Sequence, residues 1–368
     1  MNSVLYLGGF ELPDKNAAAQ RVIAIGKTLC ELGFAVSFWG VSKEGNASES
    51  TFEGFSCKSI SYPTSTKQWI KHIWNFIPIN EIEACHPDIV VLYNFPSLAS
   101  LKILRYCHSH GIKVFHDTTE WEYADGHSLR DIIKDVDTWL RMKYCLRKMD
   151  GVIAISRYLY NYYASKVKTV LIPPTVDLKD KKWDRGRELT TGNKVKLIYA
   201  GSAGAKSKDR LDHIVEALCQ YDNMELEVVG MTQDQYEKDF GSLPDGCNNL
   251  IFKGRLPHNE AVKAVLDSDF QMLIREDNLK NRAGFPTKFV ESISCCTPLI
   301  STLSSNIEDY IIDGKNGFVV DEANCLSKVL ERVSRLSIEE RTEMKIFCRE
   351  NNQFDYHNYT EELKKLLS

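Results

Sequence analysis

Short runs of β-branched and aromatic residues alternate with amphipathic helical patterns along the whole chain. This alternation is typical of parallel βαβ units, because two parallel strands need a crossover connection that is usually a helix. Twelve runs predict strands, six in each half, at residues 4–7, 35–39, 89–93, 113–115, 152–155, 170–172, 195–200, 224–229, 250–252, 270–274, 299–301 and 318–320. The pattern therefore predicts an α/β protein.

The two halves are separated by a polar stretch at residues 177–193, which follows Pro173 and Pro174 and has no clear hydrophobic period. A chain of 368 residues has room for about two domains. We expect two tandem Rossmann-like, doubly wound domains facing a central cleft, at residues 1–175 and 176–355. A terminal helix at 356–368 is expected to pack back on the first domain. In such folds, ligands bind at the carboxyl ends of the strands.

Charge and cysteine usage exclude several classes of protein. The chain has 46 basic and 50 acidic residues, and neither half has the basic excess of a nucleic-acid-binding surface, so nucleic acid is not an expected partner. No run of about 18 apolar residues predicts a membrane-spanning helix. The 11 cysteines follow no pattern, and the first residues do not resemble a signal peptide. We therefore expect reduced thiols in a cytoplasmic protein.

A loop of small residues follows the first predicted strand of each half. Gly8 and Gly9 follow the first strand, and Gly201, Ser202 and further small residues follow the strand at 195–200. Lys206 and Lys208 come next, before a helix that we expect Asp209 to open. Backbone amides and lysines near a helix N-terminus favour a phosphate group. The alternative interpretations are a tight turn for the first loop and a solvated loop for the second.

The segment at residues 282–300 carries the most specific pattern. Gly284, Phe285 and Pro286 predict a turn that starts a helix, with Thr287 and Lys288 in the first turn. There, amides and an ammonium group favour a phosphate, and Glu291 lies one turn later on the same surface. A helix start with an exposed lysine–glutamate pair is the purely structural alternative.

Taken in order, these elements resemble the donor half of the family 4 retaining glycosyltransferases, which have the GT-B fold. The second half carries the strand, the small-residue loop with its lysine, and then residues 252–257, 269–275 and 284–300. In the first half, residues 32–36 resemble the family's helix-to-strand turn, and residues 150–156 and 172–177 resemble its interdomain segment. The resemblance covers nearly the whole chain.

The resemblance implies a role for each candidate residue. Those for the donor diphosphate are Gly201, Ser202, Lys206, Lys208, Thr287 and Lys288; for the ribose, Glu291; for the nucleobase, Arg255 and Leu256; and for the donor sugar, Arg282, Gly284, Phe285 and Pro286. The first domain would contribute the glycine loop and His116, which would face the donor sugar. Asp117 would position the acceptor or, equally, cap the next turn.

Two positions depart from the family pattern. Ala283 stands where the family has the first glutamate of its paired-glutamate motif, and Ser202 stands where many members have an arginine. Arg282 and Arg275 are the neighbours that could compensate. These departures affect the identity of the donor sugar more than the reaction class.

The resemblance implies transfer of a hexose or N-acetylhexosamine, with retention, from a nucleoside-diphosphate sugar, expected to be a UDP-sugar. The acceptor would be a glycan or lipid-linked glycan in surface polysaccharide biosynthesis. No cofactor or metal is expected, because Asp135 and Asp137 lie in a helical pattern, and Asp267 and Asp269 straddle a helix end. The alternatives are a catalytically impaired nucleotide- or glycan-binding relative, suggested by Ala283, and an NAD-dependent oxidoreductase, whose glycine fingerprint is missing.

Residues 66–77 could place the protein at the inner face of a membrane. Trp69, Ile70 and Ile73, with Phe76 or Ile77, share one face of the predicted helix, and Lys67 and Lys71 lie alongside. Such a face suits interfacial docking. A helix packed on its own domain is the alternative interpretation.

Overall fold

The computed structural model describes residues 2–13, 16–43, 48–184, 186–189, 192–201 and 208–368. By Cα proximity the chain divides into two compact units. The N-terminal unit comprises Met1–Val176, Arg282–Phe285 and Asp355–Ser368, and the C-terminal unit comprises Asp177–Asn281 and Pro286–Phe354. The division between Val176 and Asp177 lies one residue from the boundary that the sequence predicts, between residues 175 and 176. The terminal segment Asp355–Ser368 belongs with the N-terminal unit.

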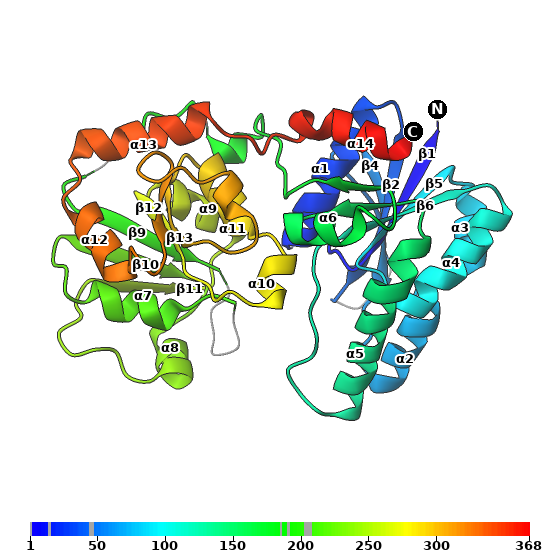
Figure 1. The fold of residues 1–368 in the computed structure, drawn as a ribbon, viewed down its shortest axis with the longest axis horizontal. Helices are drawn as coiled ribbons and strands as arrows, with labels where there is room; N and C mark the ends of the chain where they lie inside the picture. The colour runs from blue at the N-terminus through cyan, green and yellow to red at the C-terminus, as the bar shows by residue number, and fades with distance from the viewer. Residues whose placement is uncertain (1, 14–15, 44–47, 185, 190–191, 202–207) are drawn as a thin grey trace. The chain divides into compact units, whose positions relative to one another are not determined.

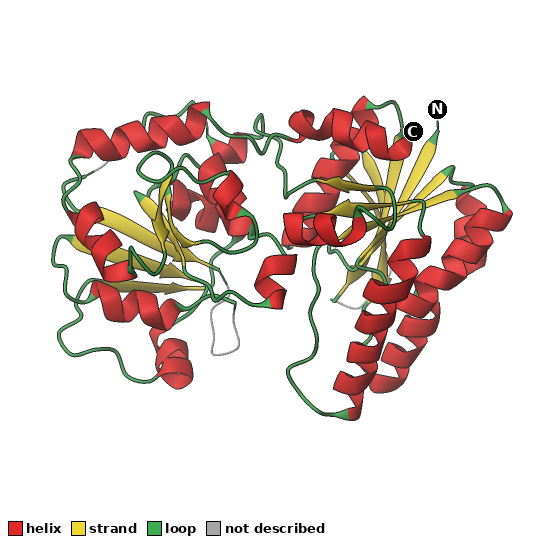
Figure 2. Cartoon of the chain, in the orientation of Figure 1, coloured by secondary structure: helices red, strands yellow, loops and turns green. Residues whose placement is uncertain are grey.

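An eight-stranded sheet forms the centre of the N-terminal unit (Figures 1 and 2). Its strand order is β3-β4-β2-β1-β5-β6-β7-β8, and every pair is parallel except β3 with β4. The strands are β1 (Ser3–Gly8), β2 (Ala35–Ser42), β3 (Ser48–Phe52), β4 (Phe55–Ser61), β5 (Ile89–Tyr93), β6 (Lys113–Thr118), β7 (Gly151–Ala154) and β8 (Thr169–Leu171). β5 is buried along its full length, as expected of a parallel strand covered on both faces.

Helices cover both faces of this sheet (Figure 1). They are α1 (Ala17–Glu31), α2 (Thr66–Asn75), α3 (Ile79–Cys85), α4 (Ser97–Ser109), α5 (Leu129–Leu140), α6 (Arg157–Tyr163) and α14 (Thr360–Leu367). α1 and the terminal helix α14 share one core, and α4 packs against both α2 and α5. A π-helical turn (Arg141–Cys145) and a 3₁₀ turn (Leu146–Lys148) continue α5.

A six-stranded, all-parallel sheet forms the centre of the C-terminal unit. Its order is β11-β10-β9-β12-β13-β14, with β9 (Val195–Ala200), β10 (Met224–Val229), β11 (Leu250–Gly254), β12 (Phe270–Leu273), β13 (Leu299–Thr302) and β14 (Gly317–Val320). The helices are α7 (Leu211–Leu218), α8 (Gln233–Phe240), α9 (His258–Leu266), α10 (Leu279–Ala283), α11 (Thr287–Ser294), α12 (Leu326–Ser334) and α13 (Ile338–Glu350). α10 runs from this unit into the segment assigned to the N-terminal unit.

All twelve predicted strands are present, so the α/β prediction is confirmed. The hairpin of β3 and β4 was not predicted, because its sequence is rich in serine and lacks a long β-branched run. The sequence Pro13-Asp14 predicts the start of the first helix. It instead begins at Ala17, and the Asn16 side chain caps it by accepting from Ala19 N at 2.9 Å. Asp14 itself lies outside the described residues.

The expectation of reduced thiols is wrong for one pair of cysteines, because Cys219 and Cys247 form a disulfide. The two residues are 28 apart in sequence, so spacing gave no reason to pair them. In the described part of the chain, the other nine cysteines are not part of a disulfide. Within the described part of the chain, the helices are too short or too polar to cross a membrane.

Candidate functional site

The strand order of the C-terminal unit reverses between β9 and β12, which are neighbours in its sheet. In open parallel sheets this switch point is the default place for a ligand, just beyond the carboxyl ends of the strands. Gly201 follows β9 and Arg275 follows β12 by two residues. Arg210 N donates to Ile274 O at 2.8 Å, which ties the start of α7 to the end of β12. The switch point therefore carries both Gly201, the first residue of the predicted small-residue loop, and a guanidinium group.

Asp209 is the centre of a hydrogen-bonded cluster at this switch point. Its Oδ2 accepts from Tyr199 Oη at 2.8 Å and from Lys288 Nζ. Its Oδ1 accepts from Arg275 Nε at 2.5 Å. Lys288 Nζ also donates to Tyr199 Oη at 3.0 Å. The Asp209 side chain is 3% exposed, whereas those of Lys288 and Arg275 are 14% and 11% exposed. We call these four residues the switch-point cluster.

Electrostatics keep Asp209 ionised. Burial opposes its charge, but the neighbouring Lys288 and Arg275 prevail and lower the pKa of Asp209 to about 2. Burial also lowers the pKa of Lys288, and the charge of Asp209 opposes that shift. The expectation that Asp209 opens the next helix is wrong, because α7 begins at Leu211 with Arg210 as its N-cap. Asp209 instead holds two cations in place.

Gly201 leaves room for the Lys288 side chain, and Gly230 leaves room for the backbone of Gly201. A Cβ on Gly201 would lie 2.2 Å from both Cε and Nζ of Lys288, and Gly201 has φ +150°. A Cβ on Gly230 would lie 2.2 Å from the Gly201 carbonyl oxygen. Any side chain at Gly201 would therefore displace the ammonium group, which explains the small residue directly after β9.

α11 begins at Thr287, as the Gly-Phe-Pro turn predicted. Pro286 is the N-cap and has no side-chain acceptor for the first amides of the helix. Thr287 and Lys288 occupy the first turn, and Glu291 lies one turn later; burial lowers the pKa of Lys288, and the charges of Asp209 and Glu291 oppose that shift. The amides, the hydroxyl and the ammonium group lie together where an anion is favoured.

The other predicted donor residues lie in several places. Arg255, which is exposed, and Leu256 directly follow β11, at the same carboxyl edge as the switch-point cluster. Lys208 is half-buried next to Asp209. Ser202 and Lys206 lie outside the described residues. Apart from Ser202 and Lys206, the residues predicted to bind the diphosphate and the nucleobase therefore lie at the carboxyl edge of the sheet in the C-terminal unit.

The predicted donor-sugar residues belong to a separate segment. Arg282, Gly284 and Phe285 group with the N-terminal unit, whereas Pro286 groups with the C-terminal unit. Ala283 is fully buried, and its carbonyl accepts from Ser156 Oγ at 2.7 Å. The residue at the position of the missing glutamate is thus fixed through its backbone.

His116 and Asp117 are neighbours on β6, so their side chains point to opposite faces of the sheet. The His116 ring is fully buried, and its Nδ1 lies 2.7 Å from Thr118 Oγ1. Its Nε2 is buried without a hydrogen-bond partner among the described residues. Burial, with a contribution from the charge of Arg141, lowers the pKa of His116 well below its usual value. The ring is therefore neutral at physiological pH.

The Asp117 carboxylate is fully buried within the N-terminal unit. Arg21 donates to it through Nε at 3.0 Å to each oxygen and through NH2 at 2.7 Å to Oδ1, and Tyr6 Oη donates at 2.7 Å. The remaining terminal nitrogen of Arg21 donates to the carbonyls of Ile172 and Pro173, each at 3.0 Å. Asp117 is thus neither a cap of the next turn nor open to an acceptor in this arrangement. Its partners make it a structural anchor.

Gly8 is required by packing at the end of β1. A Cβ there would lie 2.6 Å from both Cβ and the carbonyl oxygen of Tyr93 on the adjacent β5. Gly9 has open space around its Cα, so a side chain would fit there. Only the first glycine of this predicted loop is therefore explained by its neighbours.

Comparison with known families decides the identity of the two units. The family described as Glycosyltransferase Family 4 matches residues 18–180, and the family described as Glycosyl transferases group 1 matches residues 180–350. The chain belongs to the family 4 glycosyltransferases. No curated protein sequence matches this glycosyltransferase significantly.

Solved structures show that this glycosyltransferase has the GT-B fold. A sucrose-phosphate synthase from Thermosynechococcus elongatus superimposes with a TM-score of 0.72 at 14% identity, covering 100% of this chain and 98% of that one. The Anabaena protein HepE, in complex with UDP and glucose, gives 0.65 at 12% identity, covering 100% and 99%. The lipopolysaccharide outer core galactosyltransferase WaaB, without ligand, gives 0.63 at 13% identity, covering 99% of each chain.

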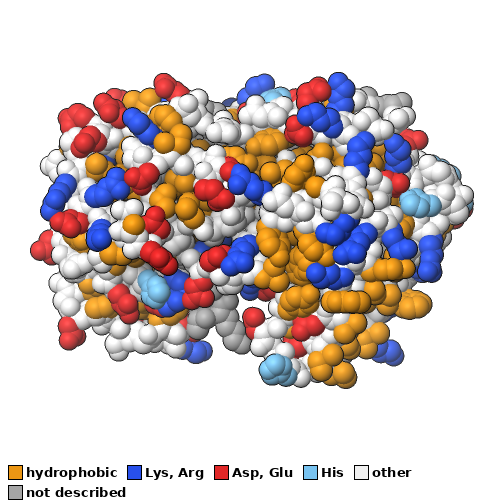
Figure 3. Space-filling model, in the orientation of Figure 1, with side chains coloured by type: hydrophobic (Ala, Val, Ile, Leu, Met, Phe, Trp, Pro, Cys, Tyr) orange, Lys and Arg blue, Asp and Glu red, His pale blue; other side chains and the backbone are white. Residues whose placement is uncertain are grey.

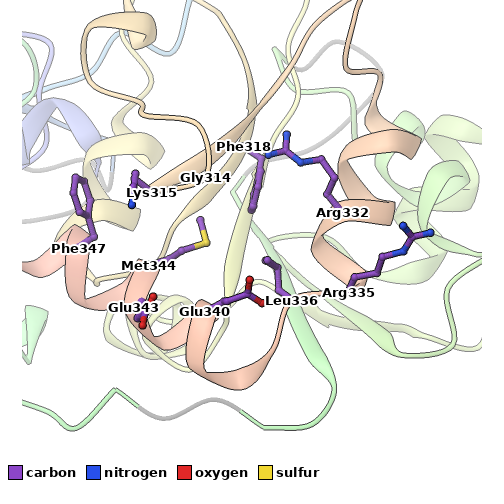
Figure 4. Close-up of a pocket in the computed structure, with 10 residues that line it drawn as sticks. All are labelled: Gly314, Lys315, Phe318, Arg332, Arg335, Leu336, Glu340, Glu343, Met344 and Phe347. Carbon is purple, nitrogen blue, oxygen red and sulfur yellow. The ribbon is translucent and has the colours of Figure 1, made fainter.

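A cavity of about 630 Å³ lies elsewhere in the C-terminal unit of the glycosyltransferase. Figure 4 shows basic side chains from α12 and acidic and apolar side chains from α13 around it. Its lining residues are Gly314, Lys315, Phe318, Arg332, Arg335, Leu336, Glu340, Glu343, Met344 and Phe347. None of these is a predicted donor residue, and two of the cations pair with carboxylates, Arg332 with Asp313 and Arg335 with Glu331. The cavity therefore does not compete with the switch-point cluster as a phosphate site.

Sequence reasoning missed how both buried clusters are built. It assigned no role to Tyr199 or Tyr6, and it took Asp209 for a helix start. One signal was available, because Tyr6 precedes Gly8 at the same spacing as Tyr199 precedes Gly201. A tyrosine two positions before the strand-end glycine in each half indicated that the two halves build similar polar clusters.

Proposed function

We propose that this glycosyltransferase transfers a hexose or N-acetylhexosamine, with retention, from a nucleoside-diphosphate sugar to a glycan. The observation that carries the proposal is the pairing of two cations with one buried carboxylate at the switch point. Lys288 and Arg275 are preorganised by Asp209, and Lys288 also lies in the uncapped first turn of α11. Cations fixed before the ligand arrives stabilise developing negative charge without reorganising.

The proposed chemistry is electrostatic in its main step. The bond between the anomeric carbon and the diphosphate oxygen breaks, and the acceptor oxygen bonds to the same face of that carbon. The acceptor proton passes to the leaving phosphate oxygen, so no protein base is needed. The engagement of Asp117 with Arg21 and Tyr6 supports this proposal. The fully buried His116 ring is neutral, so it would not act as an acid.

We propose UDP as the nucleotide. HepE was solved with UDP and glucose, and a trehalose-6-phosphate structure from E. coli of the same fold was solved with UDP-2-fluoro glucose. In this chain, the Glu291 carboxylate would accept from the two ribose hydroxyls, and Arg255 and Leu256 would meet the base. WaaB, named as a lipopolysaccharide outer core galactosyltransferase, supports a surface glycan as the acceptor.

The acceptor is proposed to be lipid-linked, with a peripheral membrane contact through residues 66–77. The face expected for this contact needs correction, since Ile73, Phe76 and Ile77 are buried in the N-terminal unit. On α2, Ile70 and Trp74 are exposed instead, on the same side as Lys67 and Lys71.

We propose that no metal is required. Asp137 of the first Asp-x-Asp sequence accepts from Ser97 N and Oγ at 2.8 and 2.7 Å. Asp269 of the second is buried and paired with Arg341 at 2.7 Å. Both carboxylates thus have partners within the protein, and the cationic side chains at the switch point offer the diphosphate its counter-charge.

A thermal-shift panel in EDTA tests the proposal. UDP, GDP, ADP, CMP and NAD are compared on the wild type and on Glu291→Ala. We expect stabilisation by UDP alone that weakens more than about tenfold in affinity in the variant, because the ribose hydroxyls lose a charged acceptor. Turnover of UDP-sugars should then survive EDTA. Stabilisation by NAD alone, or turnover restored only by added Mn²⁺ or Mg²⁺, would contradict the proposal.

A further inference from the structure

α5 of the N-terminal unit exposes a stripe of large apolar side chains. Leu129, Ile132, Val136 and Trp139 are 73%, 54%, 59% and 55% exposed. Their spacings of three, four and three residues place them on one face of the helix. This face was not singled out in the sequence, because the same helix also carries three aspartates that obscure the pattern. Isolated exposed apolar residues are ordinary, but four on one helix face are not.

α2 extends this surface. Its exposed Ile70 and Trp74 lie one helical turn apart. The guanidinium carbon of Arg130 on α5 lies 5.2 Å from the centre of the Trp69 ring on α2, so the two helices are neighbours. Figure 1 shows α2 and α5 side by side, and Figure 3 shows apolar side chains gathered over this region with basic side chains around them. We call the six exposed apolar residues of the two helices the α2–α5 surface.

The solvent-exposed charges of these two helices are mainly positive. The three aspartates of α5 all accept hydrogen bonds: Asp135 from Ala124 N and Asp137 from Ser97, whereas Asp131 caps the solvent-exposed start of the helix by accepting from Ser128. Residues 66–77 and 128–148 contain eight basic residues against these three acidic ones. Of the basic residues, Lys67, Lys71, Arg130, Arg147 and Lys148 are exposed. The outward charge is therefore positive.

We propose that the α2–α5 surface docks the protein on an anionic lipid bilayer. Apolar side chains with tryptophans in one stripe and basic residues beside them are the pattern of helices that lie in the membrane interface. A second copy of the chain fits less well, because a two-fold interface would bring each basic set against itself. This inference rests on the proposed function, because docking on a bilayer would bring the protein to a lipid-linked acceptor.

Vesicle flotation with the full chain tests the proposal. The wild type is expected to float with vesicles of phosphatidylcholine and phosphatidylglycerol, and less with phosphatidylcholine alone or at high salt. Val136→Ser/Trp139→Ser should lower the partition coefficient more than about tenfold, since both lost groups would enter the bilayer. Leu303→Ser/Ile312→Ser is the matched control, because these two side chains of the C-terminal unit are also exposed, at 42% and 51%.

A second variant separates insertion from misfolding. Trp139→Phe should keep binding while removing much of the blue shift in tryptophan emission that vesicles cause. Equal flotation of the α5 variant and its control, or no flotation of the wild type, would overturn the proposal. A wild-type dimer that becomes monomeric in Val136→Ser/Trp139→Ser would assign the surface to a second copy instead. UDP stabilisation is measured separately without vesicles, so a failure of the donor site would be recognised as such.

Discussion

Each unit builds a buried cluster of a tyrosine, an aspartate and a guanidinium group. In the N-terminal unit Tyr6 and Arg21 meet Asp117, and in the C-terminal unit Tyr199 and Arg275 meet Asp209. The tyrosine comes from the first strand of each sheet, two residues before a glycine.

The two clusters differ in charge and in exposure. In the N-terminal cluster one cation meets one carboxylate, and the side chains of Arg21 and Asp117 are 2% and 0% exposed. In the switch-point cluster Lys288 adds a second cation, and the cations retain some exposure. The extra cation and the Cβ-free space at Gly201 are the differences expected of a site for an anion. The same polar motif would thus serve stability in one unit and, in the function we propose, ligand binding in the other.

The largest expected effect concerns the stability of the N-terminal cluster. Arg21→Met removes the bidentate partner of a fully buried carboxylate and the donor to the carbonyls of Ile172 and Pro173. We expect the free energy of unfolding to fall by about 3–5 kcal/mol, because an unpaired charge is left buried. Urea unfolding followed by circular dichroism measures the change.

The matched variant in the other unit is Arg275→Met. Asp209 then keeps Lys288 and Tyr199 as partners, so the expected loss of stability is only about 1–2 kcal/mol. Equal losses for Arg21→Met and Arg275→Met would show that the two clusters do not differ as we argue.

The next effect concerns catalysis by the switch-point cluster. Lys288→Met removes a preorganised cation from the proposed diphosphate site, so kcat/KM for the donor should fall about 10²–10³-fold. The free energy of unfolding should fall by only about 1–2 kcal/mol, as for Arg275→Met, because Asp209 retains Arg275 and Tyr199. Lys238→Met, at an exposed lysine of α8 in the same unit, is the control. A variant at Lys288 with normal turnover would remove this residue from the site.

Local patterns in the sequence predicted much of the fold and part of the site. The hydrophobic periods gave all twelve strands, because buried parallel strands are short, nearly continuous apolar runs. The turn at residues 284–286 gave the start of α11 and thus the positions of Thr287, Lys288 and Glu291. The hairpin of β3 and β4 escaped because its exposed edge strand needs little apolar sequence.

The clusters could not be predicted because their members come together only in the folded units. Asp117 meets partners that are 96 and 111 residues away, and Asp209 meets Lys288 across 79 residues. Helix and strand periods carry no information about such pairings. The exposed stripe of α5 escaped for a related reason, since the sequence does not tell which face of an amphipathic helix the protein covers.

The smallest expected effect is a change in UDP affinity caused by a substitution at Asp209, and it tests most directly how the two clusters differ. In the absence of donor, the Asp209 carboxylate occupies the cations that the diphosphate would meet, so the two anions compete. Asp209→Asn removes that competing charge and keeps one oxygen as an acceptor, for either Lys288 or Arg275, with an amide donor in place of the other oxygen. We expect the affinity for UDP, measured by isothermal titration calorimetry, to rise about three- to tenfold, a gain of about 1 kcal/mol. The stability of the variant without UDP should fall, since two cations would then lie together without their carboxylate.

The same substitution at Asp117 should leave UDP affinity unchanged, because that cluster only anchors the N-terminal unit. Weaker UDP binding by Asp209→Asn would mean that the carboxylate positions Lys288 for the donor more than it competes with it.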